Sequence, residues 1–128
     1  MKYLRVEQVL FIHARIIAET GGEHGVIDLG LLESAVGRPQ GIFDGIELYP
    51  DLFSKAAALL QSLVGNHAFL DGNKRTAIAS VGLYLSANGY ELTASNRELE
   101  SFVLRCAQGS ETLQEIARWL RDNSEVKK

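Results

Sequence analysis

A polar cluster interrupts two apolar stretches near the middle of the chain. The nine residues His67–Arg75 read HAFLDGNKR and bring together a histidine, an aspartate, an asparagine and two cations. A histidine can accept a proton near physiological pH, so His67 is a candidate general base. A carboxylate beside bound phosphates suits Mg²⁺ that protein and phosphate hold jointly, so Asp71 is a candidate ligand for that ion.

The residues after Asp71 add the features of an anion site. Asn73 or Lys74 is expected to begin a helix, whose first backbone N–H groups have no partner within the helix. Gly72 allows the backbone to approach a ligand closely, and the side chains of Lys74 and Arg75 add positive charge. A base, a metal ligand and donors for phosphates together indicate phosphoryl or nucleotidyl transfer.

A purely structural interpretation of the cluster also exists. Asp71 would then be only an N-cap and Gly72 only a turn residue. Lys74 and Arg75 would form only the solvated first turn of a helix. Cations are misplaced at a helix N-terminus, which prefers anions, and this misplacement favours a bound external anion. The phosphate-binding pattern G-x-x-x-x-G-K-[ST] does not describe the stretch, because Asn73 separates Gly72 from Lys74.

The elements that must position this cluster are helices, because apolar residues recur along the chain at helical spacing between capping residues. The pattern predicts six helices: residues 6–20, 29–37 after a cap at Asp28, 52–66 after a cap at Asp51, 73–87, 96–107 after a capping box of Ser95 and Glu98, and a sixth after a cap at Ser110. No β-sheet is expected, and the polar tail 124–128 is expected to fray. We therefore predict an all-α bundle that forms a single domain over residues 1–128.

A long connection separates the second and third predicted helices. Residues 38–50 hold both prolines, two glycines and alternating apolar residues around Ile42, Phe43 and Ile46. This pattern predicts a long loop or a small hairpin. Ordered loops of this length in small domains are more often functional than not.

Composition limits the class of protein. Apolar residues make up 46% and charged residues 23% of the 128 positions, which places the chain among globular domains and not among disordered ones. The net charge of -3 argues against non-specific nucleic-acid binding, which rests on cations. No stretch is apolar enough for a membrane helix, and the N-terminus does not resemble a signal peptide. Cys106 is the only cysteine, which excludes an internal disulfide and suits a reducing cytoplasm.

Two stretches carry a resemblance to a known family. HAFLDGNKRTA, His67–Ala77, resembles the signature of the Fic/Doc family, and most closely that of its Doc (death-on-curing) branch. LGLLESAVGRPQ, Leu29–Gln40, is similar to the second helix and the start of the flap in Doc-like proteins. The resemblance extends over nearly the whole chain. It implies a compact Fic-fold bundle of about six helices with a flap between helices two and three.

The resemblance also implies a role for each matching residue of the motif. His67 corresponds to the general base, Asp71 to the Mg²⁺ ligand and Phe69 to the buried aromatic that anchors the loop. The phosphates of ATP would be bound by four consecutive residues, Gly72, Asn73, Lys74 and Arg75.

The target and an inhibitor are implied in the same way. Gly41, Ile42 and Phe43 would bind the target protein, because a Fic/Doc flap pairs with the target backbone. The segment S/T-x-x-x-E-[GN], which forms the internal inhibitory helix of many Fic proteins, does not occur in the sequence. A separate Phd-like antitoxin, bound in the groove of the active site, is therefore the expected inhibitor.

Lys74 distinguishes two activities within the family. Members that transfer AMP have glycine at this position, whereas lysine is the Doc form. The second arginine of the longer Fic signature would fall at Ile78 and is missing here, as it is in Doc proteins. The resemblance therefore implies a toxin that acts as a kinase, passes the γ-phosphate of ATP to a threonine of elongation factor Tu and stops translation.

Other interpretations stay open at this point. One is AMP transfer by a Fic-type enzyme with an unusual motif, and another is a non-enzymatic module that binds a peptide or a nucleotide. A zinc site built from His13, His24 and His67 is disfavoured, because no close pair of histidines supports it. His13 lies on the apolar face of the first helix and is expected to pack in the core. Cys106 is expected to be a small buried apolar residue.

Overall fold

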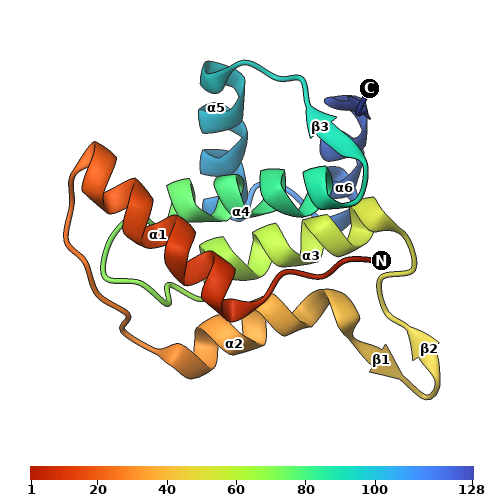
Figure 1. Cartoon of the computed structure of the whole chain (residues 1–128). Helices are drawn as coiled ribbons and strands as arrows, with labels where there is room; N and C mark the ends of the chain where they lie inside the picture. Colours follow the sequence, from red (N-terminus) through yellow and green to blue (C-terminus); the bar gives the residue numbers. More distant parts are fainter.

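The computed structural model describes all 128 residues and consists mainly of helices (Figure 1). The predicted all-α bundle is confirmed. Its elements are the six helices α1 Val6–Thr20, α2 Leu29–Gly37, α3 Leu52–Gly65, α4 Asn73–Ala87, α5 Asn96–Ala107 and α6 Leu113–Asp122, the short 3₁₀ helix η1 Arg38–Gln40, and the strands β1 Ile42–Phe43, β2 Ile46–Glu47, β3 Tyr90–Leu92 and β4 Ser124–Val126.

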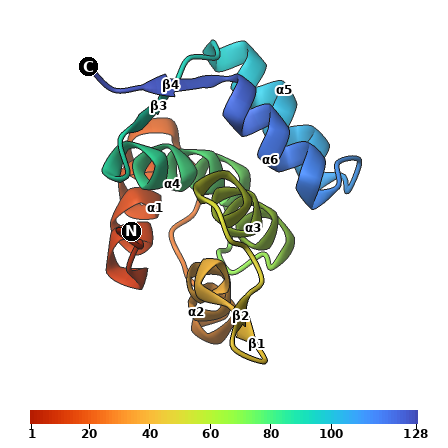
Figure 2. The same cartoon turned by 90° about the vertical axis from the view of Figure 1, so that its right-hand side faces the viewer.

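Helix α3 forms the centre of the bundle and contacts α2, α4, α5 and α6. The view along α3 shows α4 and α6 on different sides of it, with α2 below (Figure 2). Five consecutive residues of α3, Ala56 to Leu60, are each at most 1% exposed. Such a helix is apolar on every side because protein surrounds it, and its alanines allow neighbouring helices to approach closely.

Capping side chains set most of the helix boundaries. The predicted caps at Asp28, Asp51 and Ser95 are confirmed, since each side chain accepts a hydrogen bond from the third backbone N–H of its helix. The predicted cap at Ser110 is wrong. Thr112 caps α6 instead, because Glu115 stands three residues later and its carboxylate accepts a hydrogen bond from the Thr112 N–H, which completes a capping box.

Two small antiparallel sheets occur where the sequence predicts only one possible hairpin and no sheet. The hairpin forms from β1 and β2, with Asp44 and Gly45 both at positive φ in the turn. The second sheet pairs β3 with β4, so the prediction of a frayed tail is also wrong. Lys127 extends the pairing by donating its N–H to the carbonyl of Gly89. This pairing joins segments far apart in sequence, which local periodicity does not reveal.

None of the helices combines the length and hydropathy that a bilayer crossing requires. The core is a single cluster of buried apolar residues to which all six helices contribute. Within it, Phe102 of α5 stacks on Trp119 of α6 with ring centroids 3.7 Å apart. Cys106 is buried at 6% exposure, as expected. Burial raises the pKa of its thiol to about 12, so this cysteine is not a thiolate nucleophile at neutral pH.

Candidate active site

The motif loop, residues 66–72, connects the end of α3 to the start of α4 and lies beside the loop that follows α1 (Figure 1). Backbone hydrogen bonds join the two loops. The N–H groups of Ile27 and Asp28 donate to the carbonyl of Ala68 at 2.7 and 3.2 Å, and the Leu70 N–H donates to the carbonyl of Gly25 at 3.0 Å. These bonds hold the motif loop in one conformation without using its functional side chains.

His67 lies on the surface of this loop. Its side chain is exposed and makes no hydrogen bond within the protein. Its backbone adopts φ +48°, a left-handed conformation that histidine and asparagine tolerate better than most residues. The next two residues, Ala68 and Phe69, are only 2% exposed. The chain therefore enters the core immediately after His67 and leaves the imidazole free to meet an external hydroxyl.

A second histidine, His13, packs against the buried side of the motif loop. His13 of α1 is 4% exposed, and its ring stacks on Phe69 with centroids 3.8 Å apart and planes 10° apart. Its Nε2 lies 2.8 Å from the carbonyl oxygen of Asp71. A carbonyl only accepts, so Nε2 carries the proton and donates. The expectation that His13 packs in the core is confirmed. Its hydrogen bond also fixes the backbone of the residue predicted to bind Mg²⁺.

The side chain of Asn73 braces the same loop. Its Oδ1 accepts the N–H of Phe69 at 3.1 Å, and its Nδ2 donates to the carbonyl of Phe69 at 2.9 Å. Both ends of the amide are thus engaged within the protein. The predicted phosphate contact of Asn73 would therefore come from its backbone N–H.

The carboxylate of Asp71 points toward backbone donors and remains half-exposed. Oδ1 accepts the N–H of Gly72 at 2.8 Å, and Oδ2 accepts the N–H of Glu23 at 3.3 Å. Arg75 lies 3.7 Å from Oδ1. Each carboxylate oxygen has a second lone pair, so these contacts orient Asp71 without exhausting its capacity to bind a cation.

Arg75 and Lys74 differ in their surroundings. The guanidinium of Arg75 donates to the hydroxyl of Thr20 and to the carbonyl of Gly21 at the end of α1, as well as pairing with Asp71. Its charge is therefore shared with the negative end of the α1 dipole. Lys74 is exposed and forms no ion pair or hydrogen bond. Lys74 is thus the free cation of the motif.

The start of α4 has the unpaired donors that the predicted anion site requires. Gly72 is the N-cap at φ +78° and brings no capping side chain, and the first helical bond is donated by Thr76. The N–H groups of Asn73, Lys74 and Arg75 consequently have no acceptor in the protein, and such a helix end attracts phosphates. A Cβ at position 72 would lie 3.0 Å from the terminal methyl of Ile17, and the backbone there is left-handed at φ +78°, so a larger residue would be strained at this position.

The donor set around Asp71 fits Mg²⁺ only in partnership with a nucleotide. No three histidine, cysteine or acidic side chains lie close enough together to hold a metal ion, and His13, His24 and His67 do not converge. Mg²⁺ is commonly held by one or two carboxylates with phosphate oxygens and waters. The single oriented carboxylate beside the free N–H groups of α4 matches that arrangement.

The structure does not bring the predicted flap residues to the motif. Gly41, Ile42 and Phe43 precede α3, and His67 follows it, so the two regions lie at opposite ends of this helix (Figure 1). The 14 residues of α3 correspond to a length of about 20 Å. A role of the hairpin in target binding stays a prediction. It would require a target protein that contacts the hairpin at one end of α3 and His67 at the other.

Comparison of the sequence with known proteins identifies the family of the chain. A sequence model described as the Fic/DOC family matches residues 3–85, and this region contains the whole motif loop. The chain is 33% identical over 121 residues to "Protein kinase doc" of Escherichia phage P1, with 94% of each chain covered. It is 57% identical over 74 residues to "Toxin Doc" of Mycolicibacterium smegmatis, covering 58% of this chain and 57% of that relative. On sequence match and motif together, the chain belongs to the Fic/DOC family.

Proposed function

We propose that this protein is a toxin that acts as a Doc-type kinase. It transfers the γ-phosphate of ATP to a hydroxyl of a translation factor in the cytoplasm, with elongation factor Tu as the target, and thereby blocks translation. One observation carries the proposal: an exposed, unbonded His67 stands on a braced loop beside Asp71 and the unpaired N–H groups of α4. The names of the two relatives, a toxin and a protein kinase, support it.

Each part of the site has a step in this reaction. His67 accepts the proton of the target hydroxyl as its oxygen forms a bond to the γ-phosphorus. The bond between that phosphorus and the bridging oxygen of ADP breaks, and ADP leaves. The backbone N–H groups of Asn73, Lys74 and Arg75 hold the phosphates in line. Mg²⁺ bound by Asp71 and phosphate oxygens would neutralise negative charge at the transferred group.

AMP transfer is the alternative reaction, and Lys74 argues against it. Lys74 places an unpaired positive charge and a long side chain beside the anion site, where AMP-transferring relatives have only a glycine. The positive charge of Lys74 favours binding of ATP with its terminal phosphate near His67. A non-enzymatic module is the less suitable interpretation, because it has no use for an exposed base next to a phosphate site.

The added mass on the target distinguishes the two reactions. After incubation with ATP and elongation factor Tu, the unmutated protein should add a phosphate of about 80 Da, not an AMP group of about 329 Da. Lys74→Gly should weaken phosphate transfer. Lys128 is an exposed lysine outside the site, so Lys128→Gly is the control and should behave as the unmutated protein. An AMP adduct from the unmutated protein would replace the kinase assignment by the AMP-transfer one.

A groove next to the motif is the proposed binding site for an antitoxin. It runs between α1, α4 and α5. Five of its ten lining residues are apolar, and the polar ones include two cations of the motif and one acid: Ile16, Ile78, Leu99, Val103 and Leu104, with Lys74, Arg75 and Glu100. An amphipathic helix with an acidic end would match both parts of this surface. We infer that a Phd-like antitoxin binds here and covers Lys74, which would deny the nucleotide its site.

The groove can be tested without altering the motif. Leu104 is 47% exposed in the groove, and Leu104→Glu should leave toxicity intact while a co-expressed antitoxin from a small neighbouring gene no longer restores growth. Leu83→Glu is the control, because Leu83 is a partly exposed leucine of α4 outside the groove. Full rescue of the Leu104→Glu strain, with soluble toxin confirmed, would place the antitoxin elsewhere.

A further inference from the structure

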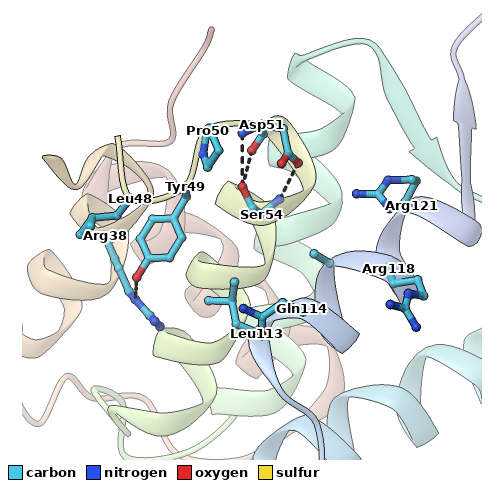
Figure 3. Close-up of a pocket in the computed structure, with 11 residues that line it drawn as sticks. Arg38, Leu48, Tyr49, Pro50, Asp51, Ser54, Leu113, Gln114, Arg118 and Arg121 are labelled. Atoms are coloured by element: carbon cyan, nitrogen blue, oxygen red, sulfur yellow. Dashed lines mark hydrogen bonds between the residues drawn. The ribbon is translucent and has the colours of Figure 1, made fainter. Parts of the chain in front are cut away.

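A second cleft lies between the base of the hairpin and α6 (Figure 3). Its volume is about 520 Å³, and none of the motif residues lines it. The polar side chains around it come from η1, from the start of α3 and from α6: Arg38, Asp51, Ser54, Gln114, Arg118 and Arg121. Three arginines and a single carboxylate thus face one space in a chain whose net charge is -3.

The arginines of α6 have no ion-pair partner, and the Arg121 guanidinium lies over the ring of Phe53 at 5.8 Å from its centroid. Gln114, Arg118 and Arg121 follow the spacing i, i+4, i+7, so they share one face of the helix. Neither Arg118 nor Arg121 forms an ion pair or a hydrogen bond. The neighbouring carboxylates of Asp51 and Glu115 are each engaged in a helix cap. The cleft therefore holds three arginine side chains against one lining carboxylate, that of Asp51, and only Arg118 has the charge of Glu115 nearby.

The third arginine is held rigidly on the opposite wall. Nε of Arg38 donates to the Tyr49 hydroxyl at 2.9 Å, and Nη1 donates to Gln61 at 2.8 Å and to Ser62 at 3.0 Å. Its Nη2 has no acceptor in the protein. A guanidinium fixed in this way loses little conformational entropy when it binds an anion. Figure 3 shows Arg38 with Tyr49 on one side of the cleft and Arg118 and Arg121 on the other.

Backbone groups add to the positive potential. The cleft borders the first turn of α3, where Asp51 caps only the N–H of Ser54. The N–H groups of Leu52 and Phe53 remain unpaired at that helix end. The N-terminal end of a helix carries partial positive charge, and the Asp51 carboxylate offsets part of it here, so the arginines remain the main attraction for an anion.

Apolar surface continues from the cleft onto the hairpin. Leu48 lines the cleft at 55% exposure, and Ile42, Phe43 and Ile46 of the hairpin are 64–73% exposed. The base of the hairpin is fixed, because the buried Lys55 of α3 bonds the Glu47 carboxylate at 2.8 Å. A rigid basic cleft joined to a wide apolar edge suits a segment of a protein better than a small anion.

We propose that this cleft docks an acidic segment of the protein substrate, at a distance from the site of phosphate transfer. The assignment of the partner as the substrate rests on the proposed kinase function. The cleft borders the first turn of α3 at Asp51 and Ser54 and extends to Arg38, whose guanidinium bonds Ser62, whereas His67 follows the end of α3 and no residue of the motif lines the cleft. Docking there would raise the affinity for the substrate while leaving the chemistry at His67 unchanged, because the cleft has no contact with the transferred phosphate.

Direct binding is the first test. Hexaglutamate and inorganic phosphate are titrated separately into the whole protein while the Nε–Hε signals of its arginines are followed by NMR. Hexaglutamate should shift the signals of Arg118 and Arg121 saturably, and phosphate should not compete at equal concentration. Arg118→Gln/Arg121→Gln should weaken peptide binding at least about tenfold, whereas Lys2→Gln/Lys128→Gln, which removes the same charge elsewhere, should not. Equal loss in both double variants, or tighter binding of phosphate, would overturn the proposal.

Steady-state kinetics then test whether the protein substrate is what binds in the cleft. With elongation factor Tu and ATP, Arg118→Gln/Arg121→Gln should raise KM for the protein substrate at least about tenfold and leave kcat and KM for ATP within about twofold. An unchanged KM for the protein would show that the substrate does not dock in the cleft. If the unmutated protein transfers no phosphate but still binds hexaglutamate through these arginines, the kinase function fails and the acidic docking site stands.

Discussion

Replacement of His67 by asparagine is expected to abolish growth arrest and to reduce phosphate transfer by at least about a hundredfold, because the target hydroxyl then has no base. Asparagine is the suitable substitute at this position. It tolerates the left-handed backbone of residue 67, φ +48°, whereas alanine there would add strain of about 1 kcal/mol that is unrelated to catalysis. Transfer is measured as label from γ-labelled ATP on elongation factor Tu.

A neighbouring histidine provides the control for this variant. His24 is exposed in the loop beside the motif and makes no hydrogen bond. His24→Ala should transfer phosphate at the rate of the unmutated protein. Growth arrest by a well-folded His67→Asn variant, with an unchanged melting temperature, would show that His67 is not the base.

Replacement of Asp71 by asparagine is expected to lower transfer at least about tenfold, because the neutral amide cannot hold Mg²⁺ as a carboxylate does. Asparagine keeps the size of the side chain and one acceptor for the N–H groups of Gly72 and Glu23, so the loop should remain in place. Raised Mg²⁺ concentration should restore the rate only in part. The dependence of the rate on Mg²⁺ is measured for the variant and for the unmutated protein.

Asp122→Asn makes the same chemical change at the exposed end of α6 and should leave both the rate and its Mg²⁺ dependence unaltered. An Asp71→Asn variant with the same Mg²⁺ dependence as the unmutated protein would argue against a metal role for this carboxylate. The free energy of unfolding should be measured for Asp71→Asn as well, because Arg75 also pairs with Asp71.

The bounds of the helices follow from local sequence signals. Asp28, Asp51 and Ser95 each begin a helix because a side-chain oxygen satisfies an N–H group a few residues along, an interaction that needs no partner from elsewhere. The Asp44–Gly45 turn is local in the same sense. The predicted cap at Ser110 is wrong by only two residues, because the true cap, Thr112, is completed by the local hydrogen bond that Glu115 accepts.

The sequence also shows which residue types the motif contains, but it does not predict which groups those side chains contact. The loop at Gly25 pairs with Leu70, and His13 bonds the carbonyl of Asp71 from 58 positions away. A histidine on an apolar helix face indicates burial and says nothing of which carbonyl it meets. Periodicity describes a residue relative to its own helix, whereas these contacts depend on how two helices pack.

The sequence by itself determined the six helices, the caps at Asp28, Asp51 and Ser95, and a motif whose residue types suit a base, a metal ligand and an anion site. Only the tertiary structure decided how the motif is braced, with Asn73 turned to the Phe69 backbone and Lys74 left as the free cation. It also placed the hairpin at the far end of α3 and joined Arg38 to Arg118 and Arg121 around one cleft. The physical reason is that capping and periodicity act within a few residues, whereas burial and pairing between distant segments arise when the helices pack around α3.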